Sequence, residues 1–227
     1  MTIGILQCGD PPEALRSQHG AYGAMTQRLL GSGRDTWTFD VTRGVLPAHA
    51  AACSAYILTG SPAGVYDDLP WIAGLIGFLR QARGRAKLVG ICFGHQAMAE
   101  AFGGGVVKSP KGWGVGLQRY DVRHRVPWMD DAAHVDVPAS HQDQVVTCPP
   151  GAQVIAANAF TPYAGLDYGD AISFQFHPEF SPAFSVALIE AERDRYGALA
   201  GPAIASYSQP DDCNRIGGWI SRFLATP

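Results

Sequence analysis

The segment Leu88-Val89-Gly90-Ile91-Cys92-Phe93-Gly94-His95-Gln96 passes from a short apolar run into a stretch with helical character. It sets a cysteine between two glycines, each two residues away. A thiol placed after a strand and before a helix is typical of a nucleophile elbow, a sharp turn that exposes a reactive side chain. Side chains at the two flanking positions would clash as the helix folds back over the strand, so glycine is expected there. We therefore predict that Cys92 is a nucleophile at a strand–helix corner.

Glycine spacing alone is modest evidence, because 27 of the 227 residues are glycine. The alternative is a buried structural cysteine in a glycine-rich corner. In the elbow geometry the helix N-terminus points at the sulfur and favours the thiolate, and backbone N–H groups there can hold an oxyanion. A nucleophile also needs a base, and the base needs a group that orients it, so a suitable partner decides between the two interpretations.

The segment His177-Pro178-Glu179 supplies such a partner. Residues two apart in an extended segment share a face, so the carboxylate of Glu179 can lie beside the His177 ring. It would fix the tautomer and raise the basicity of the other ring nitrogen. Five of the other histidines offer no comparable pair: His19, His49, His124 and His134 are predicted in surface segments, and His95 is predicted to point away from the sulfur.

Short β-rich apolar runs alternate with helical stretches over the first half of the chain. The predicted strands are 3–8, 36–41, 55–59 and 87–91, and the predicted helices are 12–30, 69–83 and 94–102. Such alternation indicates a parallel sheet with helices on both faces. The expected fold class is therefore α/β, with a central mostly parallel sheet flanked by helices.

The second half of the chain has a different texture. Shorter runs predict partly antiparallel strands at 116–123, 135–137, 145–147, 153–157 and 164–168, followed by a strand at 171–176 and helices at 181–196 and 214–224. No repeat or linker separates the two halves. We predict a single domain over 1–227, in which a smaller, partly antiparallel region is attached to the central sheet.

Composition argues against several classes of function. The chain carries 17 Lys and Arg against 20 Asp and Glu, so no strong field favours nucleic acid or an anionic membrane surface. Its five cysteines lack a Cys-x-x-Cys pair, which argues against a zinc or redox site and favours reduced thiols in a cytoplasmic protein. The sequence shows no signal peptide and no membrane-spanning run. Dinucleotide-binding, phosphate-binding and His-Glu-x-x-His motifs are also missing, so we expect no cofactor and no metal.

The segment Gly90-Ile91-Cys92-Phe93-Gly94-His95-Gln96, followed by His177-Pro178-Glu179, resembles class I (triad) glutamine amidotransferases. This family includes the glutaminase domain of GMP synthase and stand-alone γ-glutamyl peptidase-like proteins. The resemblance implies that Cys92 is the nucleophile, His177 the general base and acid, and Glu179 the residue that orients His177. In α/β-hydrolases the acid lies between nucleophile and histidine; here it follows the histidine, which favours the amidotransferase interpretation.

The resemblance also implies an oxyanion hole made of backbone groups. The N–H of Phe93 matches one donor. The loop Thr59-Gly60-Ser61-Pro62 resembles the family's Gly-Gly-Pro loop, which supplies the second donor from Gly60 and Ser61. Ser61 replaces the second glycine of that loop.

Four further residues are implied to bind the substrate. Gln96 matches a glutamine that contacts substrate in the family. Ser140, Gln142 and Asp143 lie in Ala139-Ser140-His141-Gln142-Asp143, which resembles the segment that binds the amino-acid end of glutamine.

The implied reaction is hydrolysis of the γ-carboxamide of glutamine, or of a related γ-glutamyl amide, through a γ-glutamyl thioester on Cys92. The partner is then a small-molecule glutamine or γ-glutamyl substrate. Too few residues follow the predicted helix at 181–196 for a fused synthase domain. The replacement at Ser61 and the segment Ser140-His141-Gln142-Asp143 lead us to expect a stand-alone enzyme. Two alternatives stay open: a glutaminase subunit that delivers ammonia to a separate synthase, and a non-catalytic relative that binds a ligand or partner.

Overall fold

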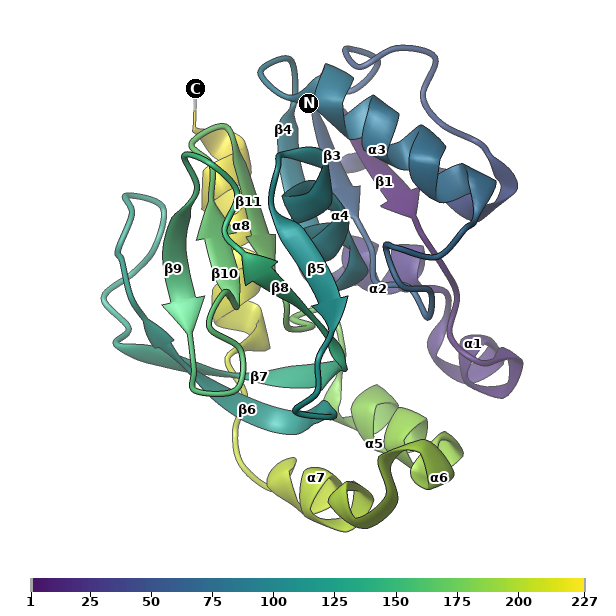
Figure 1. Cartoon of the computed structure of the whole chain (residues 1–227), viewed down its shortest axis with the longest axis vertical. Coiled ribbons are helices and arrows are strands. Elements are labelled where there is room, and N and C mark those ends of the chain that lie inside the picture. Colours follow the sequence, from purple (N-terminus) through teal and green to yellow (C-terminus); the bar gives the residue numbers. More distant parts are fainter. Residues whose placement is uncertain (1, 227) are drawn as a thin grey trace.

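The central sheet of the computed structural model, which describes residues 2–226, has nine strands in the order β2-β1-β3-β4-β11-β10-β9-β6-β7 (Figure 1). Its parallel strands are β1 (Thr2–Gln7), β2 (Asp35–Asp40), β3 (Ala55–Leu58), β4 (Lys87–Ile91) and β11 (Ala171–Phe174). Strands β3 and β11 are buried along their whole length, as near-continuous apolar runs predict for strands covered on both faces. The predicted α/β fold with a mostly parallel centre is confirmed.

Antiparallel strands extend the sheet beyond β11. They are β6 (Gly114–Val122), β7 (His134–His141), β9 (Gln153–Ala157) and β10 (Gly165–Asp167). Strands β5 (Gly105–Lys108) and β8 (Asp143–Thr147) form a separate antiparallel pair. Figure 1 shows β6 and β7 running crosswise below the rest of the sheet. The predicted smaller, partly antiparallel region is therefore present.

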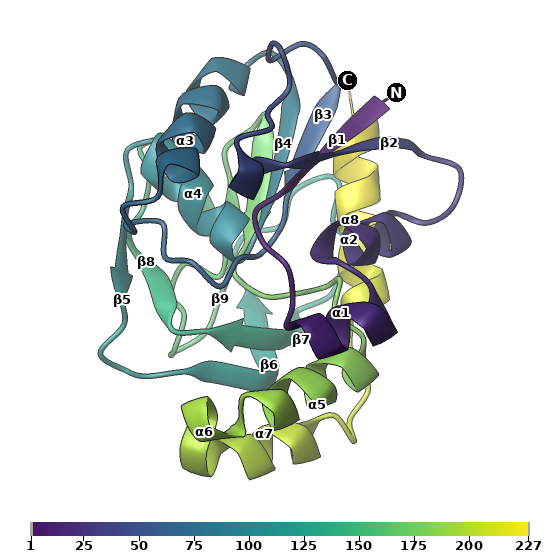
Figure 2. The ribbon, with the colours of Figure 1, turned by 90° about the vertical axis from the view of Figure 1, so that its right-hand side faces the viewer.

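Helices cover both faces of the sheet and one of its ends. Figure 2 shows α3 (Pro70–Ala82) and α4 (Phe93–Ala101) on one face, and α2 (Tyr22–Leu30) and α8 (Cys213–Ala225) on the other. The short helices α1 (Glu13–His19), α5 (Pro182–Ala191), α6 (Arg193–Tyr196) and α7 (Ala200–Ser206) gather at the end where β6 and β7 lie. Two 3-10 turns, Val41–Arg43 and Gly197–Leu199, complete the described elements. No helix within residues 2–226 is long and apolar enough to cross a membrane.

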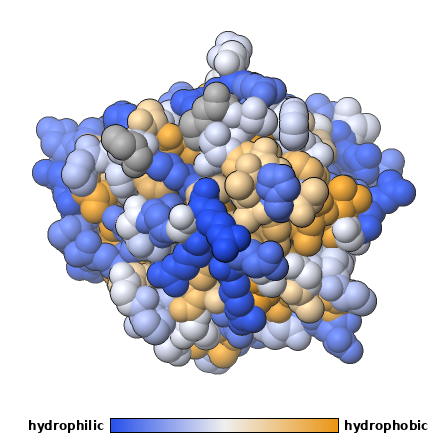
Figure 3. Space-filling model, turned by 90° about the horizontal axis from the view of Figure 1, so that it is seen from above, coloured by the Kyte–Doolittle hydropathy of each residue, from blue (hydrophilic) through white to orange (hydrophobic). Residues whose placement is uncertain are grey.

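The two ends of the parallel sheet differ in what covers them. Figure 3 views the end near both termini, where polar side chains are interspersed with apolar ones and the largest apolar patch lies right of centre. The parallel strands begin at this end and point toward the opposite one, where β6, β7 and α5 to α7 lie (Figure 1). In open α/β sheets, ligands bind outside the carboxyl ends of the strands.

Several predicted elements differ in their extent. The single helix predicted at 12–30 is wrong: the chain forms α1 and α2, because Gly20 adopts a φ of 90°, which no helix accommodates. The helix predicted at 181–196 is divided into α5 and α6 at Glu192. Strand β7 extends beyond the predicted 135–137, since Pro138 is tolerated on an edge strand. Strand β5 and helix α7 were not predicted.

The corner between β4 and α4 has no room for a side chain on either flank of Cys92. A Cβ on Gly90 would lie 2.6 Å from the carbonyl oxygen of Gly94. A Cβ on Gly94 would lie 2.5 Å from the Leu58 Cβ and 2.7 Å from the Leu58 carbonyl oxygen. These separations are far below van der Waals contact, so close approach of the backbone requires glycine on both flanks, as the sequence predicts.

Replacing Gly94 by alanine is therefore expected to destabilise the fold. The Gly94→Ala substitution forces a methyl group against the backbone of β3, and overpacking of this kind costs about 1–3 kcal/mol in the free energy of unfolding. Urea denaturation measures this difference directly. Gly77→Ala in α3 is the matched control, because its Cβ meets no atom within 4 Å and alanine stabilises a helix interior. An unchanged free energy of unfolding in Gly94→Ala would contradict the steric argument.

Candidate active site

Cys92 lies at the corner between β4 and α4 and has a strained backbone conformation. It is the N-cap of α4, with φ 51° and ψ −103°, and it is the one non-glycine residue between positions 2 and 226 with positive φ. An L-residue adopts this conformation only when surrounding structure imposes it, and such strain concentrates at functional sites. Cys92 therefore has the strained backbone of a sharp strand–helix turn, and its role as a nucleophile stays a prediction.

His177 and Glu179 lie in the segment that leaves β11. The Nδ1 atom of His177 is 2.8 Å from Oε1 of Glu179, and both side chains are almost completely buried. The backbone N–H of His177 donates to the carbonyl of Pro138 in β7 at 2.8 Å. The ring of Phe180 stacks on the His177 ring with a centroid distance of 4.0 Å and an interplanar angle of 9°. Neighbours on the backbone, the edge and the face of the ring therefore fix its orientation.

Cys92 and His177 both lie close to Gly60. A Cβ built on Gly60 would lie 3.0 Å from Cε1 of His177 and 3.8 Å from Cβ of Cys92. The loop after β3 therefore packs against both side chains at once. Any larger residue at this position would push on the His177 ring.

The charges around His177 favour its protonated form. Burial alone would lower the pKa of His177, but the negative charges of a Cys92 thiolate and the Glu179 carboxylate raise it above its ordinary value. His177 therefore keeps its proton to a higher pH than a free histidine. A protonated imidazole beside a thiol can donate a proton to a leaving group and stabilise the thiolate electrostatically.

The loop predicted to hold an oxyanion lies directly beside Cys92. Gly60 and Ser61 line the same pocket as Cys92. The buried hydroxyl of Thr59 accepts the N–H of Cys8 at 2.9 Å, which fixes the start of this loop. The Ser61 hydroxyl accepts the N–H of Ala63 at 3.1 Å and thereby braces the loop itself. Phe93, the other predicted donor, is the first residue of α4.

The four residues predicted to bind substrate line this pocket too: Gln96, Ser140, Gln142 and Asp143. The side-chain amide of Gln96 donates to the carbonyl of Asp143 at 3.0 Å and to Oε1 of Gln175 at 3.1 Å. The carboxylate of Asp143 accepts a hydrogen bond from the hydroxyl of Tyr66 at 2.9 Å. Gln96 therefore ties α4 to the start of β8.

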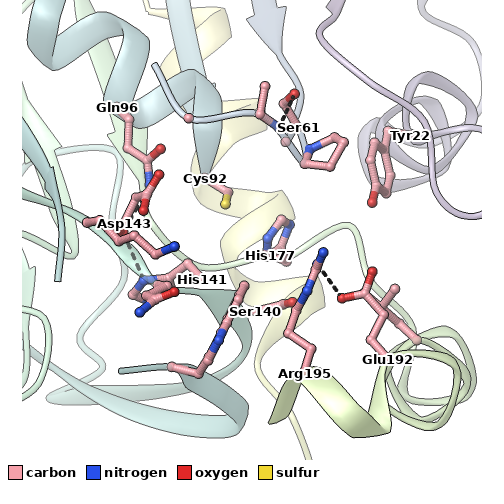
Figure 4. Close-up of a pocket in the computed structure, with 18 of the residues that line it drawn as sticks. Tyr22, Ser61, Cys92, Gln96, Ser140, His141, Asp143, His177, Glu192 and Arg195 are labelled. Carbon is pink, nitrogen blue, oxygen red and sulfur yellow. Dashed lines mark hydrogen bonds and ion pairs between the residues drawn. The ribbon is translucent and has the colours of Figure 1, made fainter. Parts of the chain in front are cut away.

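The pocket has a volume of about 390 Å³, which is in the range of small-molecule sites (Figure 4). Cys92 and His177 lie near its middle in Figure 4. Its lining includes residues that the sequence analysis did not single out: Tyr22, Tyr66, Lys108, Trp113, Phe180, Glu192, Arg195 and Tyr196. They come from several segments of the chain, with Glu192, Arg195 and Tyr196 together at α6, and carry no motif of their own. Phe180 alone had a local signal, since it directly follows Glu179.

Two further histidines lie close to this site and are buried. Burial and the charge of His177 lower the pKa of His141 to about 3, so its ring is neutral at physiological pH. His95, on α4, places Nδ1 2.7 Å from the hydroxyl of Ser173 in β11, which holds the helix against the sheet. This partner agrees with the prediction that His95 points away from the sulfur. Within residues 2–226, no cluster of three or more His, Cys, Asp or Glu side chains is arranged to hold a metal ion.

Comparison with known sequences connects this geometry to a family. The family model described as "Glutamine amidotransferase class-I" matches residues 30–189. The chain is 30% identical to a glutamine amidotransferase-like protein of Schizosaccharomyces pombe, over 79% of each chain. It is 27% identical to γ-glutamyl peptidase 4 of Arabidopsis thaliana, over 74% of this chain and 72% of the peptidase. It is 33% identical to a glutamine-hydrolysing GMP synthase of Thermomicrobium roseum, over 58% of this chain but 25% of the synthase.

Comparison of folds agrees. The crystal structure of a glutamine amidotransferase from Thermotoga maritima superposes with a TM-score of 0.81, covering 100% of this chain and 99% of the other at 16% sequence identity. At this identity the likeness concerns the fold. The fold comparison shows a shared fold, and the family assignment rests on the sequence comparison.

The charge of Glu179 is expected to control the titration of His177. In Glu179→Gln the amide can still accept a hydrogen bond from Nδ1, but the negative charge that favours imidazolium is gone. The pKa of His177 should therefore fall, and its titration midpoint should move to lower pH in an NMR titration of the ring Cε1 proton. The control is Glu190→Gln, which removes an exposed carboxylate paired with Arg193. A midpoint that stays in place or rises in Glu179→Gln would contradict this account of the pair.

Proposed function

The chain belongs to the class-I glutamine amidotransferase family, and we propose that it hydrolyses a γ-glutamyl amide with Cys92, His177 and Glu179 as its catalytic triad. One observation carries the proposal. Gly60 packs on both Cys92 and His177 at the centre of a pocket, while Glu179 holds the far nitrogen of the histidine. A strained thiol, a basic partner and an orienting carboxylate are the components that nucleophilic catalysis needs.

In the first half of the reaction, the Cys92 thiolate attacks the γ-carbonyl carbon and a C–S bond forms. The carbonyl π electrons move onto oxygen. When they return, the C–N bond breaks and protonated His177 transfers its proton to the departing nitrogen. The amine leaves, and a γ-glutamyl thioester remains on Cys92. The carboxylate of Glu179 stabilises the imidazolium that precedes this proton transfer.

In the second half, neutral His177 removes a proton from a water molecule as the water oxygen attacks the thioester carbonyl. A second tetrahedral intermediate collapses, the C–S bond breaks, and the thiolate of Cys92 is regenerated beside protonated His177. The γ-carboxylate of the glutamyl group is the second product. In total, one amide and one water give one carboxylic acid and one amine.

Backbone donors from Phe93 and the Gly60–Ser61 turn would stabilise the oxyanion of both intermediates. Each such donor contributes about 3 kcal/mol to the activation free energy in comparable enzymes. Two contacts hold the loop: the Thr59 hydroxyl accepts the N–H of Cys8 at its start, and the Ser61 hydroxyl accepts the N–H of Ala63 within it. The change from the family's second glycine to Ser61 is therefore compatible with a backbone donor.

The glutamyl end of the substrate would bind where Gln96 meets Asp143. The Asp143 carboxylate suits the α-ammonium group of the substrate. Lys108 suits the α-carboxylate of the substrate. Its charge lies close enough to lower the pKa of Asp143, although burial has the larger effect and raises that pKa. Ser140 and Gln142 line the same pocket. The end of the substrate that carries both charges thus meets both signs of charge.

A stand-alone γ-glutamyl hydrolase is the reading that the comparisons favour. The similarity to a γ-glutamyl peptidase extends over 72% of that peptidase, whereas the similarity to a GMP synthase covers 25% of the synthase. The synthase match nevertheless supports a second candidate, a subunit that delivers ammonia to a separate synthase. In the first case the isolated chain is active on its own, and in the second it needs its partner.

The purified chain is expected to cleave γ-glutamyl amides unaided and to release the free amine, which a coupled amine or ammonia assay measures. Cys92→Ala should reduce turnover by about 10⁴-fold or more, because loss of a triad nucleophile leaves only binding and oxyanion stabilisation. Wild-type protein mixed with substrate and quenched in acid should carry a γ-glutamyl mass on the peptide containing Cys92.

Cys148→Ala is the control, because the Cys148 thiol contacts the carbonyl of Ala152 and does not line the pocket. It should retain full activity. Activity retained in Cys92→Ala would overturn the triad. A wild-type chain that turns over neither glutamine nor γ-glutamyl peptides would favour the ammonia-delivering subunit instead.

A further inference from the structure

The pocket continues past Cys92 on the side away from Asp143. In Figure 4, Gln96 and Asp143 lie on one side of Cys92, whereas Tyr22, Glu192 and Arg195 lie on the other. All of them line the same pocket. If the proposed function holds, the acyl half of the substrate occupies the first side and the departing amine the second. Ammonia needs no binding site of this extent, so the second side fits a larger leaving group.

Arg195 lines this second side with a half-exposed side chain. Its Nη1 is 2.5 Å from Oε2 of Glu192, one turn earlier in the chain, and its guanidinium lies 5.5 Å from the ring centroid of Trp113. Figure 4 shows Arg195 reaching into the pocket toward His177, with Glu192 beside it. The hydrogen bond to Glu192 uses one of five N–H groups, and no other residue between positions 2 and 226 accepts from the guanidinium. The remaining donors are free to bind a ligand.

Aromatic side chains build the wall behind this guanidinium. Trp113 and Tyr196 pack edge to face with a centroid distance of 5.2 Å. The Tyr196 hydroxyl is 2.9 Å from the hydroxyl of Ser140, which fixes α6 against β7. Burial raises the pKa of Tyr196 to about 12, so it adds no negative charge at physiological pH. These contacts fix Tyr196 and Trp113 behind the guanidinium, and the one carboxylate on this side of the pocket, Glu192, is paired with Arg195.

The free donors of Arg195 fit an anionic group on the departing amine. The two charges of the glutamyl end are matched on the other side by Asp143 and Lys108, so Arg195 is left for a further anion. A guanidinium with two free N–H groups binds a carboxylate in bidentate fashion. We infer that the substrate is a γ-glutamyl amino acid or short γ-glutamyl peptide, whose free carboxylate on the leaving side binds to Arg195. This inference rests on the proposed function and extends it to the substrate class.

A pair of substrates that differ in one group tests it. L-γ-glutamyl-L-alanine carries the carboxylate, and L-γ-glutamyl-L-alaninamide replaces it by a neutral amide of nearly the same shape. Wild-type kcat/KM should be about tenfold or more higher for the acid, the effect of one charged hydrogen-bonded contact. Arg195→Met should abolish this preference by reducing kcat/KM for the acid alone, and Arg195→Lys should restore part of it.

Arg193→Met is the matched control on the same helix, because Arg193 pairs with Glu190 on the exposed side and does not line the pocket. It should keep the wild-type preference. Equal kcat/KM for acid and amide in the wild type, or an equal loss on both in Arg195→Met, would overturn the inference while leaving the proposed function intact.

A binding measurement separates the two proposals if turnover fails. Calorimetry on Cys92→Ala should show a Kd about tenfold or more lower for the acid than for the amide, and the difference should disappear in the Cys92→Ala, Arg195→Met double variant. This result together with an inactive wild type would support the carboxylate site and overturn the hydrolase. Equal Kd values for the two compounds would overturn the carboxylate site.

Discussion

The backbone of Cys92 is held in a conformation that isolated chains avoid, and the surrounding sheet is what holds it there. Strain of this kind costs about 1–3 kcal/mol. The Cys92 N–H donates to the carbonyl of Phe174 at 2.8 Å, and its carbonyl accepts the N–H of Gln96 at 3.0 Å. One bond anchors the turn to β11 and the other starts α4. Cys92 is buried and lines the pocket, so these two bonds hold its backbone in place beside the cavity.

The parallel pairing of β3, β4 and β11 also positions the Gly60 loop and the segment that carries His177. Strand β4 lies between β3 and β11, with Gly90 opposite Leu58 on one side and Ile91 opposite Phe174 on the other. The segments that leave these three strands therefore emerge side by side: the Gly60 loop, the Cys92 corner and the segment carrying His177. Cys92 and His177 lie in one site because they follow neighbouring strand ends.

What the sequence could predict follows from this arrangement. The Cys92 corner could be predicted from local sequence, because its flanking glycines and the change from strand to helix lie within nine residues. The His177–Glu179 pair could be predicted too, because the two residues are two positions apart. The positions of Arg195 and Trp113 could not be predicted in this way. These residues meet only through the packing of α6 on the antiparallel strands, and nothing in their local sequence marks that contact. The prediction of one helix at 12–30 was wrong for a related reason. The local composition favours a helix there, but Gly20 adopts a positive φ and ends it.

In the function proposed above, Cys92 and His177 follow the ends of parallel strands, whereas Arg195, which would bind the departing amine, lies on α6. Strand β7 joins the two parts. Pro138 in this strand accepts the backbone N–H of His177, and Ser140, two residues on, contacts Tyr196 of α6. Helix α7 packs so closely on β6 that a Cβ on Gly116 would lie 2.9 Å from the Cα of Ala203. Because β6 and β7 pair along their length, α6, which carries Arg195, and α7 are fixed relative to His177. Changes in those helices would thus alter which amine is accepted while leaving the strand ends that hold Cys92 and His177 unchanged.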